Sequence, residues 1–354
     1  AMDLIALVEG VGESPAAALF GLLTGVVFGV AAQRSRFCLR AAVVEFARGA
    51  MRDKVAVWLL TFSTALVWVQ AAQLMGVFDA SNARMMAVPG SWSGAVIGGL
   101  LFGAGMVLAN GCSGRLLVLA ATGNLRSVIS GLIFAVVAQM SLSGILSPLR
   151  DRLAGLWITS GGRNMDLLAA AHLPREAGLV IGLIIAAIAL ELSRRNRIGV
   201  SRLVFASGVG FAVALGWVLT FALSNVAFDP VQVESATFTG PSAHTLMFFL
   251  DRNAVLEFDV GLVPGVFLGA FLAAAWGCEL RVQGFDGPSP LRNAMIGAAL
   301  MGFGGMLAGG CAIGAGVTGG SIFAGTAWLA LFCMWIGGMT MELLMGGRRQ
   351  CATA

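Results

Sequence analysis

The sequence has few charged residues for its length. Of its 354 residues, 58% are apolar and 11% are charged, whereas roughly a quarter of the residues are charged in ordinary soluble domains. Apolar runs of about 18 or more residues recur along the whole chain. A water-soluble globule of this size is therefore excluded, and the composition predicts an all-α integral membrane protein.

The sequence also lacks the patterns of several common functions. Its two histidines, His172 and His244, are not near any of the six cysteines, and no CxxC pair occurs, so neither a zinc site nor a disulfide framework is indicated. No G-x-x-x-x-G-K-[ST] motif occurs, which argues against a nucleotide site. The basic residues are dispersed and form no patch typical of a nucleic-acid partner. We expect no cofactor, no metal, no catalytic residue and no nucleic acid partner, and we expect both histidines in solvated external loops.

Nine apolar stretches are long enough to cross a membrane. They lie near 16–33, 55–77, 91–109, 127–147, 177–192, 203–223, 261–278, 292–309 and 323–345. Three shorter, Gly-rich stretches near 37–47, 111–122 and 310–321 are expected to be re-entrant or interfacial helices. We interpret residues 1–354 as a single transmembrane transport domain with half-repeats at approximately 16–147 and 203–345.

The basic residues of the connections predict the orientation, because Lys and Arg accumulate in short cytoplasmic loops. Basic groups follow the first, third, fifth, seventh and ninth spans, whereas the connection after the sixth span is acidic, and only the connection at about 148–176 disagrees mildly. The N-terminus carries Asp3, Glu9 and Glu13 rather than a basic signal-peptide region. We therefore expect a multi-pass protein of the bacterial inner membrane, with a periplasmic N-terminus and a cytoplasmic C-terminus.

An internal repeat joins the third and eighth spans. The segment FGAGMVLANGC (102–112) aligns without gaps on MGFGGMLAGGC (301–311), at an offset of 199 residues. Because an odd number of crossings separates these spans, the two copies run in opposite directions, which is typical of inverted-repeat transporters with a pseudo-two-fold axis. A weaker match sets Cys38 against Cys278, each just after a Gly- and Ala-rich span.

Each copy of the repeat ends in Gly-Cys followed by small residues. Glycine permits a helix break, and irregular backbone at membrane depth is tolerated where it is buried or lines a cavity. A short helix that restarts after the break would offer its N–H groups to an anion. The cysteine thiol is a soft and weak hydrogen-bond donor, so it does not hold a sulfur acceptor tightly. The residues so selected are Cys112 and Cys311, with supporting Gly111, Gly114, Gly310 and Gly314, and Arg34, Arg36 and Arg115 as long-range cationic attraction.

Cysteine also packs as a small hydrophobe. For Cys278, Cys333 and Cys351 we favour packing or a place in the tail, and for Cys112 and Cys311 the repeat favours a functional role. The residues around Cys38 leave both readings open, because its basic neighbours are also explained as topology signals. Gly-rich helices themselves are more often packing faces than pores.

The chain resembles the YeeE/YedE family of bacterial inner-membrane proteins over essentially its whole length. The resemblance rests on QRSRFCLRAA (33–42), FGAGMVLANGCSGR (102–115) and MGFGGMLAGGCAIGAGVTG (301–319). It implies an hourglass-shaped helical protein in which three cysteines relay a sulfur anion by transient hydrogen bonds. Those cysteines correspond to Cys38, Cys112 and Cys311. The chain departs from the family pattern at Asn110 and Arg115, and Cys278 is an additional thiol.

The resemblance implies uptake of thiosulfate, or of another sulfur or selenium species, and a small cytoplasmic sulfur-carrier protein as partner. The enzyme alternative is a membrane sulfurtransferase or thiol oxidoreductase that carries sulfur as a covalent persulfide. Such a nucleophile usually needs a resolving cysteine nearby, and no CxxC supplies one. A third alternative is a pore for another solute in which the cysteines only pack.

Overall fold

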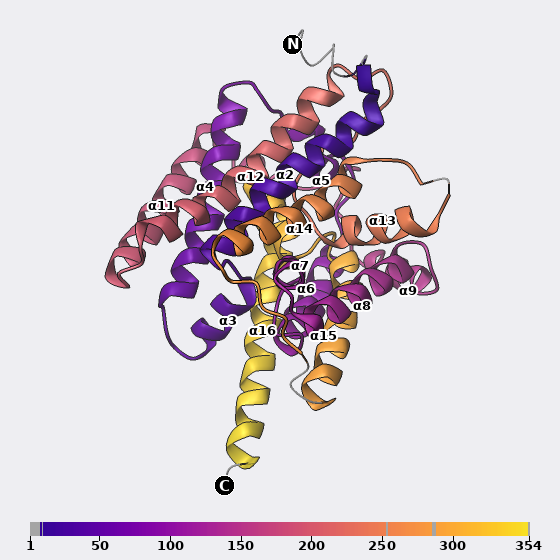
Figure 1. Cartoon of the computed structure of the whole chain (residues 1–354). Coiled ribbons are helices and arrows are strands. Elements are labelled where there is room, and N and C mark those ends of the chain that lie inside the picture. Colours follow the sequence, from indigo (N-terminus) through magenta and orange to yellow (C-terminus); the bar gives the residue numbers. More distant parts are fainter. Residues whose placement is uncertain (1–7, 9, 253, 285–287, 353–354) are drawn as a thin grey trace.

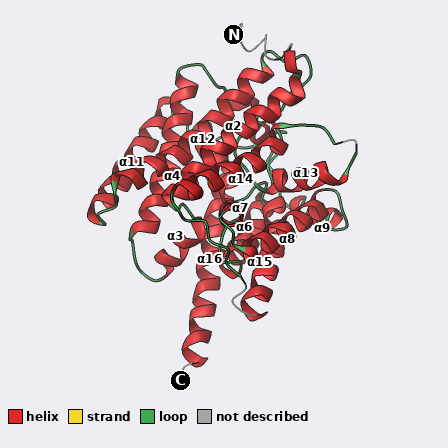
Figure 2. Ribbon diagram, viewed as in Figure 1, coloured by secondary structure: helices red, strands yellow, loops and turns green. Residues whose placement is uncertain are grey.

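The computed structural model describes residues 8, 10–252, 254–284 and 288–352. These residues form a bundle of helices joined by loops (Figures 1 and 2). Nine candidate membrane spans occur among them. They contain the long helices α2 (Glu13–Ser35), α4 (Asp53–Leu74), α6 (Trp92–Leu108), α8 (Leu125–Leu142), α11 (Glu176–Arg195), α12 (Val200–Ser224), α14 (Phe258–Trp276), α15 (Pro288–Leu307) and α16 (Gly325–Ala352). The predicted all-α membrane architecture with nine spans is confirmed.

Short helices connect or interrupt the long ones. They are the 3-10 helix η1 (Ala80–Asn82), α3 (Leu39–Ala47), α5 (Arg84–Ala87), α7 (Ser113–Ala121), α9 (Ser147–Ala154), α10 (Leu167–Ala170), α13 (Thr239–Leu250) and the π-helical segment η2 (Ala312–Gly319). Three of them, α3, α7 and η2, coincide with the three short apolar stretches of the sequence. The start of α2 and the end of α16 lie at opposite ends of the bundle (Figure 1).

Glycine brings the long helices α2 and α14 into backbone contact. Gly21, Gly25 and Gly29 of α2 face the backbone of α14, and Gly261, Gly265 and Gly269 of α14 face the backbone of α2. A Cβ on any of the six would overlap a carbonyl of the partner helix. Small residues at every fourth position are a common means of close helix packing in membranes, where lipid supplies no hydrophobic drive. These glycines are thus packing faces.

The contacts between α6 and α15 repeat at the offset found in the sequence. A Cβ on Gly98 would lie 2.5 Å from the Gly304 carbonyl oxygen, and a Cβ on Gly297 would lie 2.5 Å from the Gly105 carbonyl oxygen. Gly98 and Gly297, like Gly105 and Gly304, are 199 residues apart. Each contact therefore has a counterpart in the other copy, and α6 and α15 are antiparallel, as an inverted repeat requires.

The helix breaks of the two copies also correspond. Asn110 after α6 and Gly309 after α15 both have left-handed backbone, with φ of 58° and 78°. Asn tolerates this conformation better than most residues with a side chain, which explains its place opposite a glycine. Its side chain is held in turn, because Arg40 donates to Asn110 Oδ1 at 2.8 Å.

The acidic connection after the sixth span differs from the expected solvated loop. It contains α13, which packs on α8 and α14. Glu234 in this connection and Asp259, which the structure places in the first turn of α14, are buried at 9% and 2% exposure. The expectation for His244 was wrong: its Nδ1 lies 2.9 Å from Asp259 Oδ2 and the side chain is 35% exposed. The expectation for His172 agrees with its exposed position.

Candidate functional site

Three cysteines occupy the same local position in three short helices. Cys38 is the N-cap of α3, Cys112 is the N-cap of α7, and Cys311 is the N-cap of η2. Each therefore lies where the free N–H groups and the positive end of a helix dipole are found. In the third case the thiol itself is engaged, since the Gly314 N–H donates to Cys311 Sγ at 3.4 Å.

The fold brings these three helix starts together. The side chains of Cys38 and Cys112 lie within hydrogen-bonding reach of each other. Where α7 begins, a Cβ on Gly114 would lie 3.0 Å from Ile313 Cδ1 and 3.2 Å from Phe238 Cε2. Ile313 is the second residue of η2. The starts of α7 and η2 thus approach each other in the interior, with Ile313 and Phe238 between them.

The other predicted glycines lie at the same breaks. Gly314 is closely approached by the Thr237 side chain, and a Cβ on Gly310 would lie 2.7 Å from the Ala315 nitrogen. A Cβ on Gly111 would lie 3.3 Å from Leu116 Cδ2. A side chain at Gly310 or Gly314 would therefore displace the first turn of η2, which supports the reading that small residues are needed there.

Two of the three cysteines are closed to solvent. Cys112 and Cys311 are 1% and 0% exposed, and Ile313 and Phe238 are each 1% exposed. Cys38 is half-buried. A solute that reaches the two buried thiols therefore needs a movement of the apolar side chains around them.

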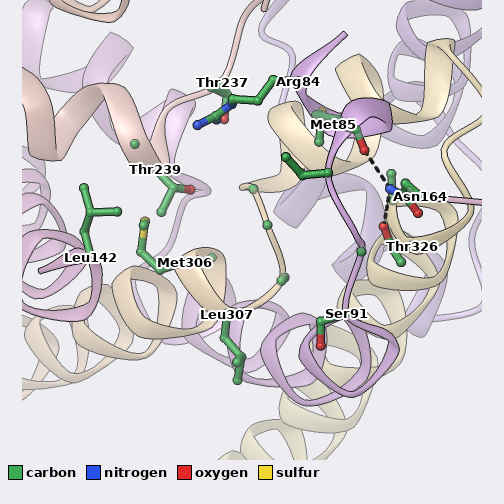
Figure 3. A pocket seen from close by; sticks show the side chains of 18 of the residues that line it. Arg84, Met85, Ser91, Leu142, Asn164, Thr237, Thr239, Met306, Leu307 and Thr326 are labelled. Atoms are coloured by element: carbon green, nitrogen blue, oxygen red, sulfur yellow. Dashed lines mark hydrogen bonds between the residues drawn. The ribbon is translucent and has the colours of Figure 1, made fainter. Parts of the chain in front are cut away.

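A cavity of about 410 Å³ ends at the break after α15. We call it the Arg84 cavity. Its lining includes Gly309 and Gly310, next to Cys311, together with Arg84, Thr237, Thr239 and His244. Figure 3 shows Arg84 beside Thr237 at one edge of the cavity, with Thr239 and Met306 at another edge. The lining is mostly apolar, and the hydroxyls and basic groups within it are suited to orienting a small anion.

A second cavity, of about 300 Å³, lies beside α7. We call it the Arg115 cavity, and Gln33, Arg36, Cys278, Glu279 and Arg281 also line it. Here Arg36 is paired with Glu279 at 3.2 Å. Arg115 Nη1 lies 3.5 Å from Gln33 Oε1.

Helix α8 places the two cavities on opposite sides of the bundle. It begins after Thr122 of the Arg115 cavity and ends at Leu142 of the Arg84 cavity. Its 18 residues span about 27 Å, close to the thickness of the hydrocarbon core.

Most of the residues selected from the sequence lie at the three cysteines or in the lining of the Arg115 cavity. Arg34 differs, because its guanidinium lies over the Phe205 ring, 5.7 Å from the centroid. Sequence reasoning missed Arg84, Thr237, Thr239 and His244, which come from connections that looked like ordinary loops. A backbone hydrogen bond joins two of these connections, because the Arg84 N–H donates to the Val233 carbonyl at 3.0 Å. No local sequence pattern predicts that contact. No group of metal-ligating side chains occurs within the part of the chain that the structure describes.

The fold and the site define a class: a multi-spanning helical membrane protein with broken helices between two cavities that contain basic side chains, which is the architecture of a transporter of small solutes. A family model described as sulphur transport matches residues 34–340. The chain belongs to this family. It is 28% identical to a thiosulfate transporter, TsuA, of Escherichia coli strain K12, over 94% of this chain and 96% of the relative. It is 27% identical to a TsuA of Spirochaeta thermophila, over 92% of this chain and 98% of the relative.

These findings confirm the predicted family resemblance and the prediction of a transporter of sulfur compounds. They agree with a multi-pass membrane protein that meets a sulfur anion and the lipid bilayer.

Proposed function

We propose that this protein takes up thiosulfate across the bacterial inner membrane along a path that joins the Arg84 cavity, Cys311, Cys112, Cys38 and the Arg115 cavity. The observation that carries the proposal is the convergence of three cysteine N-caps between two cavities that contain basic side chains. Two relatives that match 94% and 92% of the chain are named thiosulfate transporters, which supports this cargo over other sulfur or selenium species.

The path suits an anion that must not be held tightly. Helix N-termini offer partial positive charge without a full cation in the membrane interior. A thiol is a weak donor, so each contact with the sulfane sulfur is easily broken and the anion passes to the next cysteine. Ile313 and Phe238 lie between the helix starts, so they move aside for each passage.

The orientation follows from the charges. The Arg115 cavity lies on the side of the basic connections, with Arg36, Arg115 and Arg281 in its lining, and positive loops favour the cytoplasm. The Arg84 cavity then opens to the periplasm, the N-terminus is periplasmic and the C-terminus is cytoplasmic. A small cytoplasmic sulfur-carrier protein would receive the cargo at the Arg115 cavity.

The test is uptake of radiolabelled thiosulfate by vesicles that contain only this protein. Replacing Cys311 or Cys112 by Ala removes one contact of the path, and we expect uptake to fall by about tenfold or more, the effect of losing about 1.4 kcal/mol. Serine keeps a donor but a strongly hydrated one, so its effect should be intermediate. The matched control is Cys333→Ala, a buried cysteine of α16. Equal uptake by Cys311→Ala and Cys333→Ala contradicts the path.

One observation favours a second candidate, a sulfurtransferase. The proximity of Cys38 and Cys112 supplies the resolving thiol that a CxxC would otherwise provide. In this reaction a Cys thiolate attacks the sulfane sulfur of thiosulfate, the S–S bond breaks, sulfite leaves, and a persulfide remains on the cysteine. Mass spectrometry after exposure to thiosulfate and alkylation distinguishes the two: a persulfide on Cys38 or Cys112 favours the enzyme, and unmodified thiols with intact uptake favour transport.

A further inference from the structure

Two buried carboxylates and two partly exposed bases form an acid–base cluster at the Arg84 cavity. Asp259, in the first turn of α14, is 2% exposed, and its Oδ2 lies 2.9 Å from His244 Nδ1. Its other oxygen, Oδ1, is buried and has no hydrogen-bond partner. Glu234 is 9% exposed, with Oε2 4.0 Å from Arg84 Nε. The bases Arg84 and His244 line the cavity.

The fold fixes this cluster from three directions. Arg84 is held by its backbone bond to Val233, next to Glu234. Thr220 of α12 donates to the Glu234 carbonyl at 2.7 Å and accepts from its N–H at 3.2 Å. Asp259 is positioned by α14, with Gly240 of α13 against its Oδ2. These contacts hold both carboxylates beside the cavity.

The charges around His244 do not balance. Glu234, Glu257 and Asp259 are three carboxylates, and Arg84 is one permanent cation. The other helices packed on α13 are α8 and α15, which contain one ionisable residue each, Arg126 and Arg292, at the ends opposite to the Arg84 cavity. A divalent anion that enters the Arg84 cavity thus meets a cluster whose net charge is negative when His244 is neutral.

We propose that His244, Asp259, Glu234 and Arg84 form a proton-binding site linked to the Arg84 cavity, so that an oxyanion entering the cavity brings a proton onto this cluster. The proton comes from the water of the cavity and rests between the His244 imidazole and the Asp259 carboxylate, and it returns to water when the anion leaves. His244 then faces the anion as a cation beside Arg84. The inference rests on the proposed function only in taking thiosulfate as the anion.

Electrostatics also favours protonation of this cluster when an anion is bound. The hydrogen bond to Asp259 raises the pKa of His244 above its ordinary value, and burial, followed by the charge of Asp259, raises the pKa of Glu234 well above its ordinary range. A further negative charge in the cavity raises both pKa values again. By linkage, the proton must increase the affinity for the anion by the same factor.

The experiment is calorimetry of sodium thiosulfate binding to the whole protein in nanodiscs, in two buffers with different ionisation heats. Near pH 7.5 we expect an uptake of about half to one proton per anion, and an affinity that falls by up to about tenfold per pH unit above the His244 pKa. His244→Gln should abolish the proton uptake. Asp259→Asn should move it to lower pH. The matched control is His172→Gln, because His172 is exposed in a loop.

The outcomes separate this inference from the proposed function. Thiosulfate binding with equal heats in both buffers, or proton uptake that survives His244→Gln, overturns the proton site and leaves transport intact. Proton-linked binding of sulfite or sulfate, in a protein that does not carry thiosulfate, supports the proton site and overturns the cargo. Absence of binding by all three anions overturns both.

Discussion

His244 and His172 have different surroundings, and the difference predicts how stability depends on pH. His244 is hydrogen-bonded to Asp259, which raises its pKa above the ordinary value. The protonated form is therefore favoured in the folded protein. Its contribution is fully present below an unfolded pKa of about 6.5 and is lost as the pH rises through the higher folded pKa.

We therefore expect the unfolding temperature of the wild-type protein to exceed that of His244→Gln most at about pH 6, and the difference to shrink towards about pH 9. Thermal unfolding in detergent measures this difference. The matched comparison is His172→Gln, a substitution at an exposed position in a loop. A difference between wild type and His244→Gln that grows with pH would contradict the assignment of the His244–Asp259 pair.

Ile313 and Phe238 lie between the starts of α7 and η2, and their size predicts how selective the path is. Shortening Ile313 to Ala removes part of the apolar closure between the two helix starts without changing a thiol. A hydrophobic constriction excludes hydrated ions because it dewets, and a wider one does so less well. We expect Ile313→Ala to raise the entry of sulfate into vesicles several-fold relative to the wild type.

The comparison with Ile188→Ala controls for a general loss of stability. Ile188 lies on α11 and is 56% exposed, so its side chain is remote from the closure. If Ile313→Ala keeps the wild-type ratio of thiosulfate to sulfate uptake per folded protein, these side chains are not the barrier.

At the scale of helices, the packing of α2 on α14 depends on glycine. A Cβ at Gly25 would overlap the Leu262 carbonyl, and backbone cannot move aside as a flexible side chain does. Gly25→Ala should therefore destabilise the protein by about 2 kcal/mol or more, the range of substitutions that overpack a core. Thermal unfolding of the purified protein gives the size of the effect.

Gly131→Ala is the matched control, because Gly131 lies within α8 and nothing stands within 4 Å of its added Cβ. Alanine is the better helix former, so this variant should equal or exceed the wild type by up to about 1 kcal/mol. Equal unfolding temperatures for the Gly25 and Gly131 variants would show that the α2–α14 contact is not tight.

The sequence predicts the elements better than their contacts. Spans and short stretches could be located because lipid requires long apolar runs and because Gly-Cys marks the breaks before α7 and η2. The offset of 199 also anticipates that Gly98 and Gly297 make equivalent contacts. In contrast, the sequence did not predict helix α13 or the burial of the residues around it. Glu234, His244 and Asp259 lie in a stretch whose composition is typical of a solvated loop. Their burial depends on contacts with α5, α12 and α14 that no local pattern encodes.

At the scale of the whole molecule, the two cavities lie at opposite ends, and chemical labelling can test which end faces which compartment. Cys278 is exposed and lines the Arg115 cavity. Ser160 is exposed in the loop where Thr159 N–H donates to the Gly90 carbonyl, and Gly90 lines the Arg84 cavity. Residues 160 and 278 should therefore face opposite compartments.

If the basic connections face the cytoplasm, a thiol reagent that cannot cross the membrane should label Ser160→Cys from outside intact cells. It should reach Cys278 only in inside-out vesicles. A Cys351→Ser background removes the thiol of the tail, and Cys278→Ser in that background shows which signal belongs to Cys278. Buried Cys112 and Cys311 should react from neither side. Labelling of Cys278 from outside would reverse the direction of the path, because the Arg115 cavity would then be the entrance for the anion and the Arg84 cavity its exit.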